Sequence, residues 1–241
     1  MSFATFELAY WQILKEEGQR IMKRNGKKLL VLGIVFMVAF AIWTVLIQIV
    51  DVQTLGQNGM EVGFATVNCW FHRVTGVHRT IYIVTDWLGL VPLFICILFA
   101  CIGLNQWRKR RSLFKVDLDI IYLGIYYGIV IFAYLIFEMV PINYRPVLIE
   151  GFLEASYPSS TTLLVLSVMP TFIFQVNRRL ENIVVKKVIR IVSIIFSTFM
   201  VIGRLLSGVH WFTDIIGSIL LSAGLFYIYK AVIMLCDKEE K

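Results

Sequence analysis

The sequence carries little charge for its length. Charged residues make up only 16% of the 241 residues, and hydrophobic residues make up 59%. Soluble domains carry about 25% charged residues, and disordered chains have low hydrophobicity. The composition therefore excludes a disordered chain and argues against a soluble globule. We expect an integral membrane protein.

Cysteine is also scarce and is not arranged for metal or disulfide chemistry. The four cysteines contain no CxxC pair and no Cys/His spacing typical of a zinc site, and they are Cys69, Cys96, Cys101 and Cys236. The net charge of +7 could indicate a nucleic-acid partner. The basic residues, however, form short clusters between apolar runs and not one continuous basic face. No nucleic-acid partner and no metal are expected.

Long apolar runs predict an all-α fold, that of a polytopic membrane protein with six transmembrane helices. About 20 apolar residues are enough to cross a bilayer. The predicted helices cover residues 29–50, 81–104, 118–140, 161–177, 188–206 and 213–235. Residues 1–28 are expected to form a cytoplasmic or interfacial amphipathic segment, followed by a six-helix membrane phosphatase-like domain over residues 29–241.

The distribution of lysine and arginine predicts the orientation of these helices. Both termini and the loops after the second and fourth helices share one side of a six-helix arrangement and hold 19 basic residues. The other side holds four, which are Arg73, Arg79, Arg145 and Arg204. Because basic residues are retained in the cytoplasm, both termini are predicted to be cytoplasmic.

The depleted outer side carries two sets of polar residues that fit an anion site. Arg145 lies in a proline-rich loop that ends in Pro158-Ser159-Ser160-Thr161 before an apolar run. This pattern is typical of a helix N-terminus, where free amide groups and a positive dipole attract anions. Plain N-capping is the alternative explanation.

The second set is Arg204, His210 and Asp214. On a helix, the spacing of four places His210 and Asp214 on one face, so Asp214 is expected to accept a hydrogen bond from one imidazole nitrogen. The other nitrogen would then be free to act as a nucleophile. Each residue also has a structural explanation, as a cap, an interfacial ring or a snorkelling cation. Ionisable residues are costly at this depth, so their gathering on one face favours a site.

These residues resemble the type 2 phosphatidate phosphatase superfamily, an integral membrane family with the motifs K-x6-R-P, P-S-G-H and S-R-x5-H-x3-D. The matching elements are Arg145-Pro146, Pro158-Ser159 and Arg204-x5-His210-x3-Asp214. The resemblance implies that His210 becomes transiently phosphorylated and that Asp214 orients it, without a metal or other cofactor. The residues it assigns to phosphate binding are Arg145, Ser159, Ser160 and Arg204.

Four positions depart from the family's motifs. They are Glu138 in place of lysine, Ser160 in place of glycine, Thr161 in place of the second histidine and Gly203 in place of serine. The histidine missing at position 161 is the acid that would protonate the leaving group. Threonine cannot donate a proton near neutral pH, and general acid catalysis is typically worth about 10²–10⁴-fold.

Glu138 is the first candidate to replace the missing acid. Apolar neighbours flank it at the predicted outer boundary of the third helix, so it is expected to be desolvated and partly protonated. Pairing with Arg145 or Arg204 is the alternative explanation. His72 and His78 are weaker candidates.

Two functions from different classes follow. The first is a membrane-embedded lipid phosphate or polyprenyl diphosphate phosphatase of the cell membrane, acting at the outer face through a phosphohistidine. A diphosphate suits the missing acid, because phosphate departs without protonation. The alternative is a catalytically weak or inactive phosphatase-like lipid-binding membrane protein. The partners implied are a lipid phosphate or isoprenoid diphosphate and the bilayer, and a homo-oligomer is left open.

Overall fold

Six helices are long and apolar enough to cross a membrane in the computed structural model, which describes residues 3–55 and 59–236, with side chains from residue 17 onward. The prediction of six spanning helices is confirmed. The spans are Glu17–Ile49, Arg79–Arg110, Leu118–Met139, Ser160–Arg179, Ile183–Leu206 and Phe212–Cys236. They differ from the predicted ranges at their ends, where the helices continue into flanking polar residues.

The first helix, α1 (Phe3–Ile49), runs without a break through the predicted boundary at residue 28. The N-terminal segment is therefore continuous with the first spanning helix, and its position on the membrane surface stays a prediction. α1 packs along α8 (Phe212–Cys236), where the ring of Phe36 stacks on Tyr227 with centroids 5.7 Å apart. The indole of Trp43 also donates a hydrogen bond to the carbonyl of Thr213 (3.1 Å).

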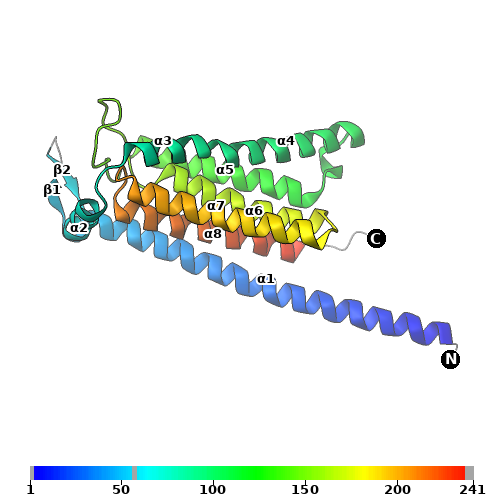
Figure 1. Ribbon diagram of the computed structural model, residues 1–241. Coiled ribbons are helices and arrows are strands. Elements are labelled where there is room, and N and C mark those ends of the chain that lie inside the picture. Colours follow the sequence, from blue (N-terminus) through cyan, green and yellow to red (C-terminus); the bar gives the residue numbers. More distant parts are fainter. Residues whose placement is uncertain (1–2, 56–58, 237–241) are drawn as a thin grey trace.

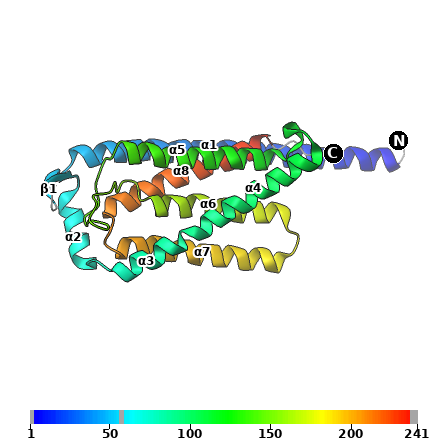
Figure 2. The same cartoon turned by 90° about the horizontal axis from the view of Figure 1, so that it is seen from above.

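The second span consists of two helices, α3 (Arg79–Leu88) and α4 (Leu90–Arg110), which are separated at Gly89. The sequence predicted a single helix here, since the hydropathy of the segment gives no sign of the interruption. α4 crosses the bundle obliquely (Figure 2). α3 instead lies beside α7 (Ile183–Leu206).

The bundle has two ends of different composition (Figure 1). One end carries the short strands β1 (Gln53–Leu55) and β2 (Met60–Val62), the helix α2 (Ala65–Thr75), the loop between α5 and α6 and the turn between α7 and α8. The opposite end carries the start of α1, the end of α8 and the two basic connections. The remaining elements are η1 (Leu113–Lys115), α5 (Leu118–Met139) and α6 (Ser160–Arg179). The six-helix arrangement thus brings the two basic loops and both ends of the chain together, and which end faces the cytoplasm stays a prediction.

An aromatic cluster in the core fixes the chain just before α6. The ring of Tyr157 stacks on Phe40 of α1 with centroids 6.1 Å apart, and it meets Phe137 of α5 edge-on at 5.7 Å. Its hydroxyl shares a hydrogen bond with Thr44 of α1 (2.8 Å). Helices α1 and α5 therefore determine where the α5–α6 loop enters the bundle.

Candidate active site

The α5–α6 loop folds back on itself and positions Arg145. An antiparallel bridge pairs Tyr144 with Ala155, and the Arg145 amide donates to the carbonyl of Glu154 (3.0 Å). The guanidinium of Arg145 also pairs with the Glu154 carboxylate, with 3.0 Å between Nη2 and Oε2. Its Nε and Nη1 are buried without a hydrogen-bond partner among the described residues. Two donors of Arg145 are therefore available to an anion.

Arg204 lies near the end of α7 and is 1% exposed. Its guanidinium lies over the ring of Tyr82, 5.1 Å from the centroid, and its Nη1 lies 3.5 Å from Thr85 Oγ1 and 3.7 Å from Asp86 Oδ1. These three partners share one face of α3, following the i, i+3, i+4 spacing. Helix α3 therefore forms one wall of the site. Within the described part of the chain, Arg204 Nε has no partner.

Gly203 allows α7 to approach α3 closely. A Cβ atom at position 203 would lie 2.7 Å from Thr85 Cγ2, which is too close for two carbon atoms. The serine of the family motif would not fit here unless α3 moved. This departure from the motif thus follows from the packing that brings α3 to Arg204.

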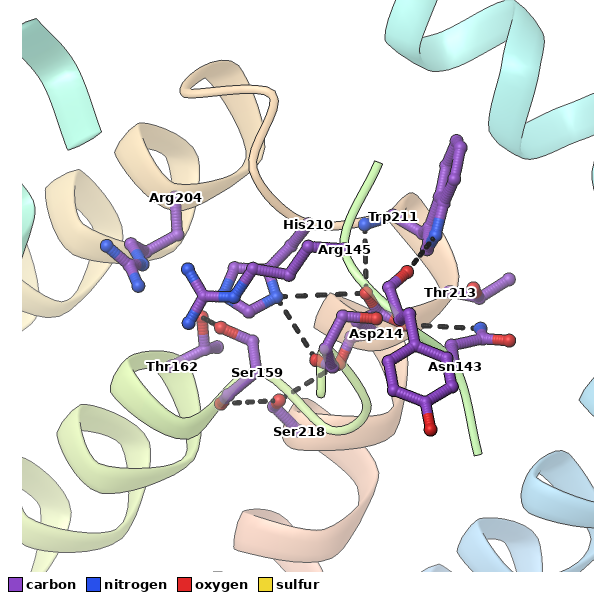
Figure 3. Close-up of polar contacts among 12 residues, drawn as sticks. Asn143, Arg145, Ser159, Thr162, Arg204, His210, Trp211, Thr213, Asp214 and Ser218 are labelled. Carbon is purple, nitrogen blue, oxygen red and sulfur yellow. Dashed lines mark hydrogen bonds and ion pairs between the residues drawn. The ribbon is translucent and has the colours of Figure 1, made fainter. Parts of the chain in front are cut away.

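His210 lies in the turn between α7 and α8 and is almost fully buried. Its Nδ1 is 3.1 Å from the carbonyl oxygen of Ser156 and 3.7 Å from Asp214 Oδ2 (Figure 3). Both neighbours are acceptors, so the neutral imidazole carries its proton on Nδ1 and its lone pair on Nε2. That Nε2 is buried and has no partner among the described residues. The nucleophile geometry expected of His210 is therefore present.

The expected hydrogen bond from His210 to Asp214 is not formed in the predicted way. The hydrogen bond goes to the Ser156 carbonyl, while the Asp214 carboxylate lies at ion-pair distance. The carboxylate instead accepts the Trp211 amide (2.9 Å) and the Asn143 side-chain amide (3.4 Å). A carboxylate in the first turn that reaches back to the amide preceding the helix is the pattern of a capping box. Asp214 therefore caps α8 and also places a negative charge beside His210.

The surroundings of His210 favour its neutral form. Burial lowers the pKa of His210 well below its usual range, and the positive charges of Arg204 and Arg145 lower it further. The hydrogen bond to the Ser156 carbonyl acts in the opposite direction. The Nε2 lone pair is therefore available at neutral pH without prior deprotonation.

The N-terminus of α6 is fixed beside the start of α8. The Ser159 amide donates to the carbonyl of Asp214 (3.4 Å), and Ser218 Oγ donates to the carbonyl of Ser159 (3.0 Å). Ser159 Oγ donates to Thr162 Oγ1 (3.1 Å). The amides of the first turn, which includes Ser160, have no partner within the helix and form its positive end. This end of α6 completes a site for an anion.

Glu138 lies on the outside of the bundle near the end of α5. Its side chain is exposed, as are those of Met139 and Val140. Among the described ion pairs none joins Glu138 to Arg145 or Arg204, and these arginines meet Glu154 and Asp86 instead. The alternative pairing is thus absent from the described ion pairs, and the acid role of Glu138 stays a prediction.

The two other histidines have structural contacts. His72 Nε2 lies 3.1 Å from the carbonyl oxygen of Gly208, which links α2 to the turn that carries His210. His78 Nε2 lies 2.8 Å from the carbonyl oxygen of Thr75. Both histidines therefore have a structural role, His72 between α2 and the α7–α8 turn and His78 at the end of α2.

The arrangement suits a phosphoryl group. Three buried guanidinium nitrogens without partners, from Arg145 and Arg204, and the Nε2 lone pair of His210 belong to one site. In Figure 3 the Arg204 side chain lies on the side of His210 away from Asp214, and the Arg145 side chain crosses the His210 ring so that its guanidinium lies on the Arg204 side. Donors of this kind hold phosphoryl oxygens, and the lone pair can attack phosphorus. Within residues 3–55 and 59–236, no group of three His, Cys, Asp or Glu side chains could hold a metal ion.

The sequence did not indicate several residues that position the site. Asn143 and the Ser156 carbonyl hold Asp214 and His210, and Tyr82, Thr85 and Asp86 surround Arg204. No spacing rule connects α3 to Arg204, because about 120 residues separate them in the chain. Only the tertiary structure brings them together.

A comparison with protein families supports the resemblance. The PAP2 superfamily matches residues 136–236. The chain thus carries a PAP2 region. This region extends from the end of α5 to the end of α8 and contains the catalytic and phosphate-binding residues assigned from the sequence, whereas the weaker candidates His72 and His78 lie outside it. The predicted resemblance is confirmed, and α3, with Asp86, lies outside the PAP2 region.

A solved structure shares the fold around this PAP2 region. It is described as the first transmembrane PAP2 type phosphatidylglycerolphosphate phosphatase from Bacillus subtilis. The two chains are 17% identical, with a TM-score of 0.63 over 86% of this chain and 98% of the other. At this identity the likeness concerns the fold. No curated protein matches the sequence.

Proposed function

We propose that the protein is a metal-independent membrane phosphatase that acts on a lipid phosphate or polyprenyl diphosphate through a phosphohistidine. Arg145, Arg204 and the N-terminus of α6 bind the phosphoryl oxygens. His210 Nε2 attacks phosphorus, and Asp214 stabilises the positive charge that develops on the imidazole. The PAP2 region and the fold shared with a membrane phosphatase support this class of activity.

The observation that carries the proposal is the buried, unpartnered Nε2 of His210 beside unpartnered arginine nitrogens. Buried polar atoms are rarely left without partners, and such an atom calls for a specific explanation. Binding of phosphate alone would require the arginines but not an oriented imidazole lone pair. The combination therefore favours chemistry over binding.

The alternative is a catalytically weak or inactive lipid-binding protein. Thr161 in place of the second motif histidine and Glu138 in place of the first motif lysine favour it. The test is phosphate release by the purified full-length chain from an alkyl phosphate, phosphatidylglycerol phosphate and farnesyl diphosphate. We expect release from at least one of them. Binding without release from any would support the inactive alternative.

We further propose that the site faces the outside of the cell membrane and that both termini are cytoplasmic. The distribution of basic residues supports this orientation, because the end of the bundle that carries the site holds four of the 23 lysines and arginines. Bulky lipid headgroups on the outer leaflet would then reach Arg145 and Arg204 without crossing the bilayer.

Cysteine labelling tests this orientation. Asn143 itself is buried, so the outer probe belongs at Phe152 in the α5–α6 loop, which is 72% exposed, and the inner probe at Phe114, which is 98% exposed. In intact cells, Phe152→Cys is expected to gain reaction with a membrane-impermeant maleimide over the wild-type background, and Phe114→Cys to gain it only after permeabilisation. Equal labelling of both before permeabilisation, or the reverse order, would contradict the proposed orientation.

The substitution Arg204→Lys tests whether Arg204 binds the phosphoryl group. Lysine keeps the charge but loses the planar fork, so it cannot keep Nη1 near Thr85 and Nε in the site. One charge-assisted hydrogen bond is worth about 1.5–3 kcal/mol, so kcat/KM should fall about 10- to 100-fold. Arg79→Lys, at the exposed start of α3, is the matched control and should retain wild-type kcat/KM. Equal values for the two variants would argue against a phosphate contact by Arg204.

A further inference from the structure

The orientation of His210 indicates on which side of a bound phosphoryl group the leaving group would lie. In phosphoryl transfer the attacking and leaving atoms are roughly in line. Figure 3 shows the His210 ring between Asp214 and the Arg204 side chain. A leaving group opposite His210 Nε2 therefore departs on the Arg204 side of the site, where α3 forms the wall.

A groove of about 290 Å³ begins on this side. It lies between α3–α4, α5 and the first turns of α6. Asp86 at the end of α3 and Ser160 and Thr161 at the start of α6 line its polar end, where Gly89 approaches Thr161. Most of the other lining residues, such as Leu93 and Ile131, are apolar. A groove with one polar end and apolar walls fits an amphiphilic leaving group, with the ester oxygen at the polar end and hydrocarbon along the walls.

Asp86 is the carboxyl group at the polar end of this groove. It is 58% exposed, and its Oδ1 lies 3.7 Å from Arg204 Nη1. It shares the groove lining with Thr161, which occupies the position where the family motif has its acid histidine. Of the groups at this polar end, the hydroxyls of Ser160 and Thr161 are too weakly acidic to donate a proton. A carboxyl group can do so.

We infer that Asp86 is the leaving-group acid of this protein, supplied by α3 from outside the PAP2 region in place of the missing histidine. The inference rests on the proposed phosphatase function. A bound phosphate competes with Asp86 for Arg204, which leaves the Asp86 carboxyl group free to turn toward the leaving oxygen. Asp86 is then both adjacent to the leaving oxygen and able to donate to it.

The step balances as follows in atoms and charges. The His210 Nε2 lone pair forms the bond to phosphorus, the bond from phosphorus to the leaving oxygen breaks, and the Asp86 proton moves to that oxygen, which leaves as an alcohol. Water then attacks the phosphorus of the phosphohistidine and gives its proton to the Asp86 carboxylate. The bond between nitrogen and phosphorus breaks, inorganic phosphate is released, and the neutral imidazole and the protonated Asp86 are restored.

The test compares three substrates that differ in their need for a proton. The first is dodecyl phosphate, whose leaving group is a poor one, an alkoxide. The other two are p-nitrophenyl phosphate and farnesyl diphosphate, whose leaving groups, p-nitrophenolate and farnesyl phosphate, are stable anions. With the full-length chain, Asp86→Asn should lower kcat/KM for dodecyl phosphate by about 10²–10⁴-fold and for the other two by less than about 10-fold. Asp86→Glu should recover part of the dodecyl phosphate activity. Glu61→Gln, an exposed carboxyl in β2 at the same end of the bundle, is the matched control.

Each other outcome has a defined meaning. Uniform losses on all three substrates in Asp86→Asn, without recovery in Asp86→Glu, would make Asp86 a partner of Arg204 only and would overturn the acid role. A selective loss of the alkyl ester in Glu138→Gln, and not in Asp86→Asn, would assign the acid to Glu138. Wild-type protein that is inactive on all three substrates would reject the proposed function itself. If the wild type is active but Asp86→Asn shows no selective loss on dodecyl phosphate, only the role of Asp86 is rejected.

Discussion

His210→Ala is expected to abolish phosphate release, with a loss in kcat on the order of 10⁴-fold or more. Alanine removes the buried Nε2 that faces the unpartnered nitrogens of Arg145 and Arg204. No other imidazole can take its place, since His72 bonds to the carbonyl of Gly208 in the α7–α8 turn and His78 to the carbonyl of Thr75 at the end of α2. The measurement is the initial rate of phosphate release on the substrate that the wild-type protein hydrolyses fastest.

The loss must be separated from misfolding. The substitution His210→Ala should not unfold the bundle, because the His210 side chain is neutral and forms one hydrogen bond, to the Ser156 carbonyl. Size-exclusion elution and thermal unfolding in detergent should match those of the wild type. A folded His210→Ala variant that releases phosphate at the wild-type rate would rule out His210 as the nucleophile.

Asp214→Asn is expected to lower kcat by about 10²–10³-fold, less than the roughly 10⁴-fold seen when a triad aspartate is replaced and the imidazole adopts the wrong tautomer. Here the Ser156 carbonyl holds Nδ1–H at 3.1 Å, so the tautomer does not depend on Asp214 alone. The variant loses the negative charge 3.7 Å from Nδ1 that would stabilise a positively charged phosphoimidazole.

The split between kinetic parameters distinguishes this role from a structural one. The asparagine side chain can still accept the Trp211 amide, so the cap of α8 should survive. Inhibition by inorganic phosphate should be nearly unchanged, because the carboxylate has no direct contact with the phosphate in the proposed mechanism. A fall in phosphate affinity that equals the fall in kcat would instead indicate collapse of the whole site.

The spanning helices could be predicted from the sequence because each one is a continuous apolar segment. The hydropathy of such a segment depends only on residues that are neighbours in the chain. The interruption at Gly89 could not, since α3 and α4 together form one continuous apolar run. Glycine at this position does not break the hydropathy pattern. The interruption matters for the site, because it separates a short helix, α3, whose residues Tyr82 and Asp86 contact Arg204.

The site was predictable where it depends on spacing within one helix or turn. His210 and Asp214 do lie together, as the separation of four residues indicated. The details that depend on distant segments were not predictable. The true acceptor of the His210 hydrogen bond is a backbone carbonyl 54 residues away, and backbone groups leave no signature in the sequence.

Glu138 shows the limit of the same reasoning. Its apolar neighbours in the sequence predicted desolvation but could not indicate a partner, and in the structure Glu138, Met139 and Val140 all lie on the outside of the bundle. Asp86, in contrast, was not predicted as a site residue, since an isolated carboxylate in an apolar run belongs to no motif. The structure makes it a candidate because its helix contacts Arg204 and lines the groove beside Thr161.

The central claim, a phosphohistidine on His210, is tested most directly by trapping the intermediate. The full-length protein is incubated with a substrate that carries labelled phosphorus in the transferred phosphoryl group, quenched in alkali within one turnover and digested for mass spectrometry. We expect a phosphoryl group on His210 that is stable to alkali and lost in acid, and that is absent from His210→Ala. Turnover that continues with no phosphorylated His210, or with the label on another residue, would contradict it.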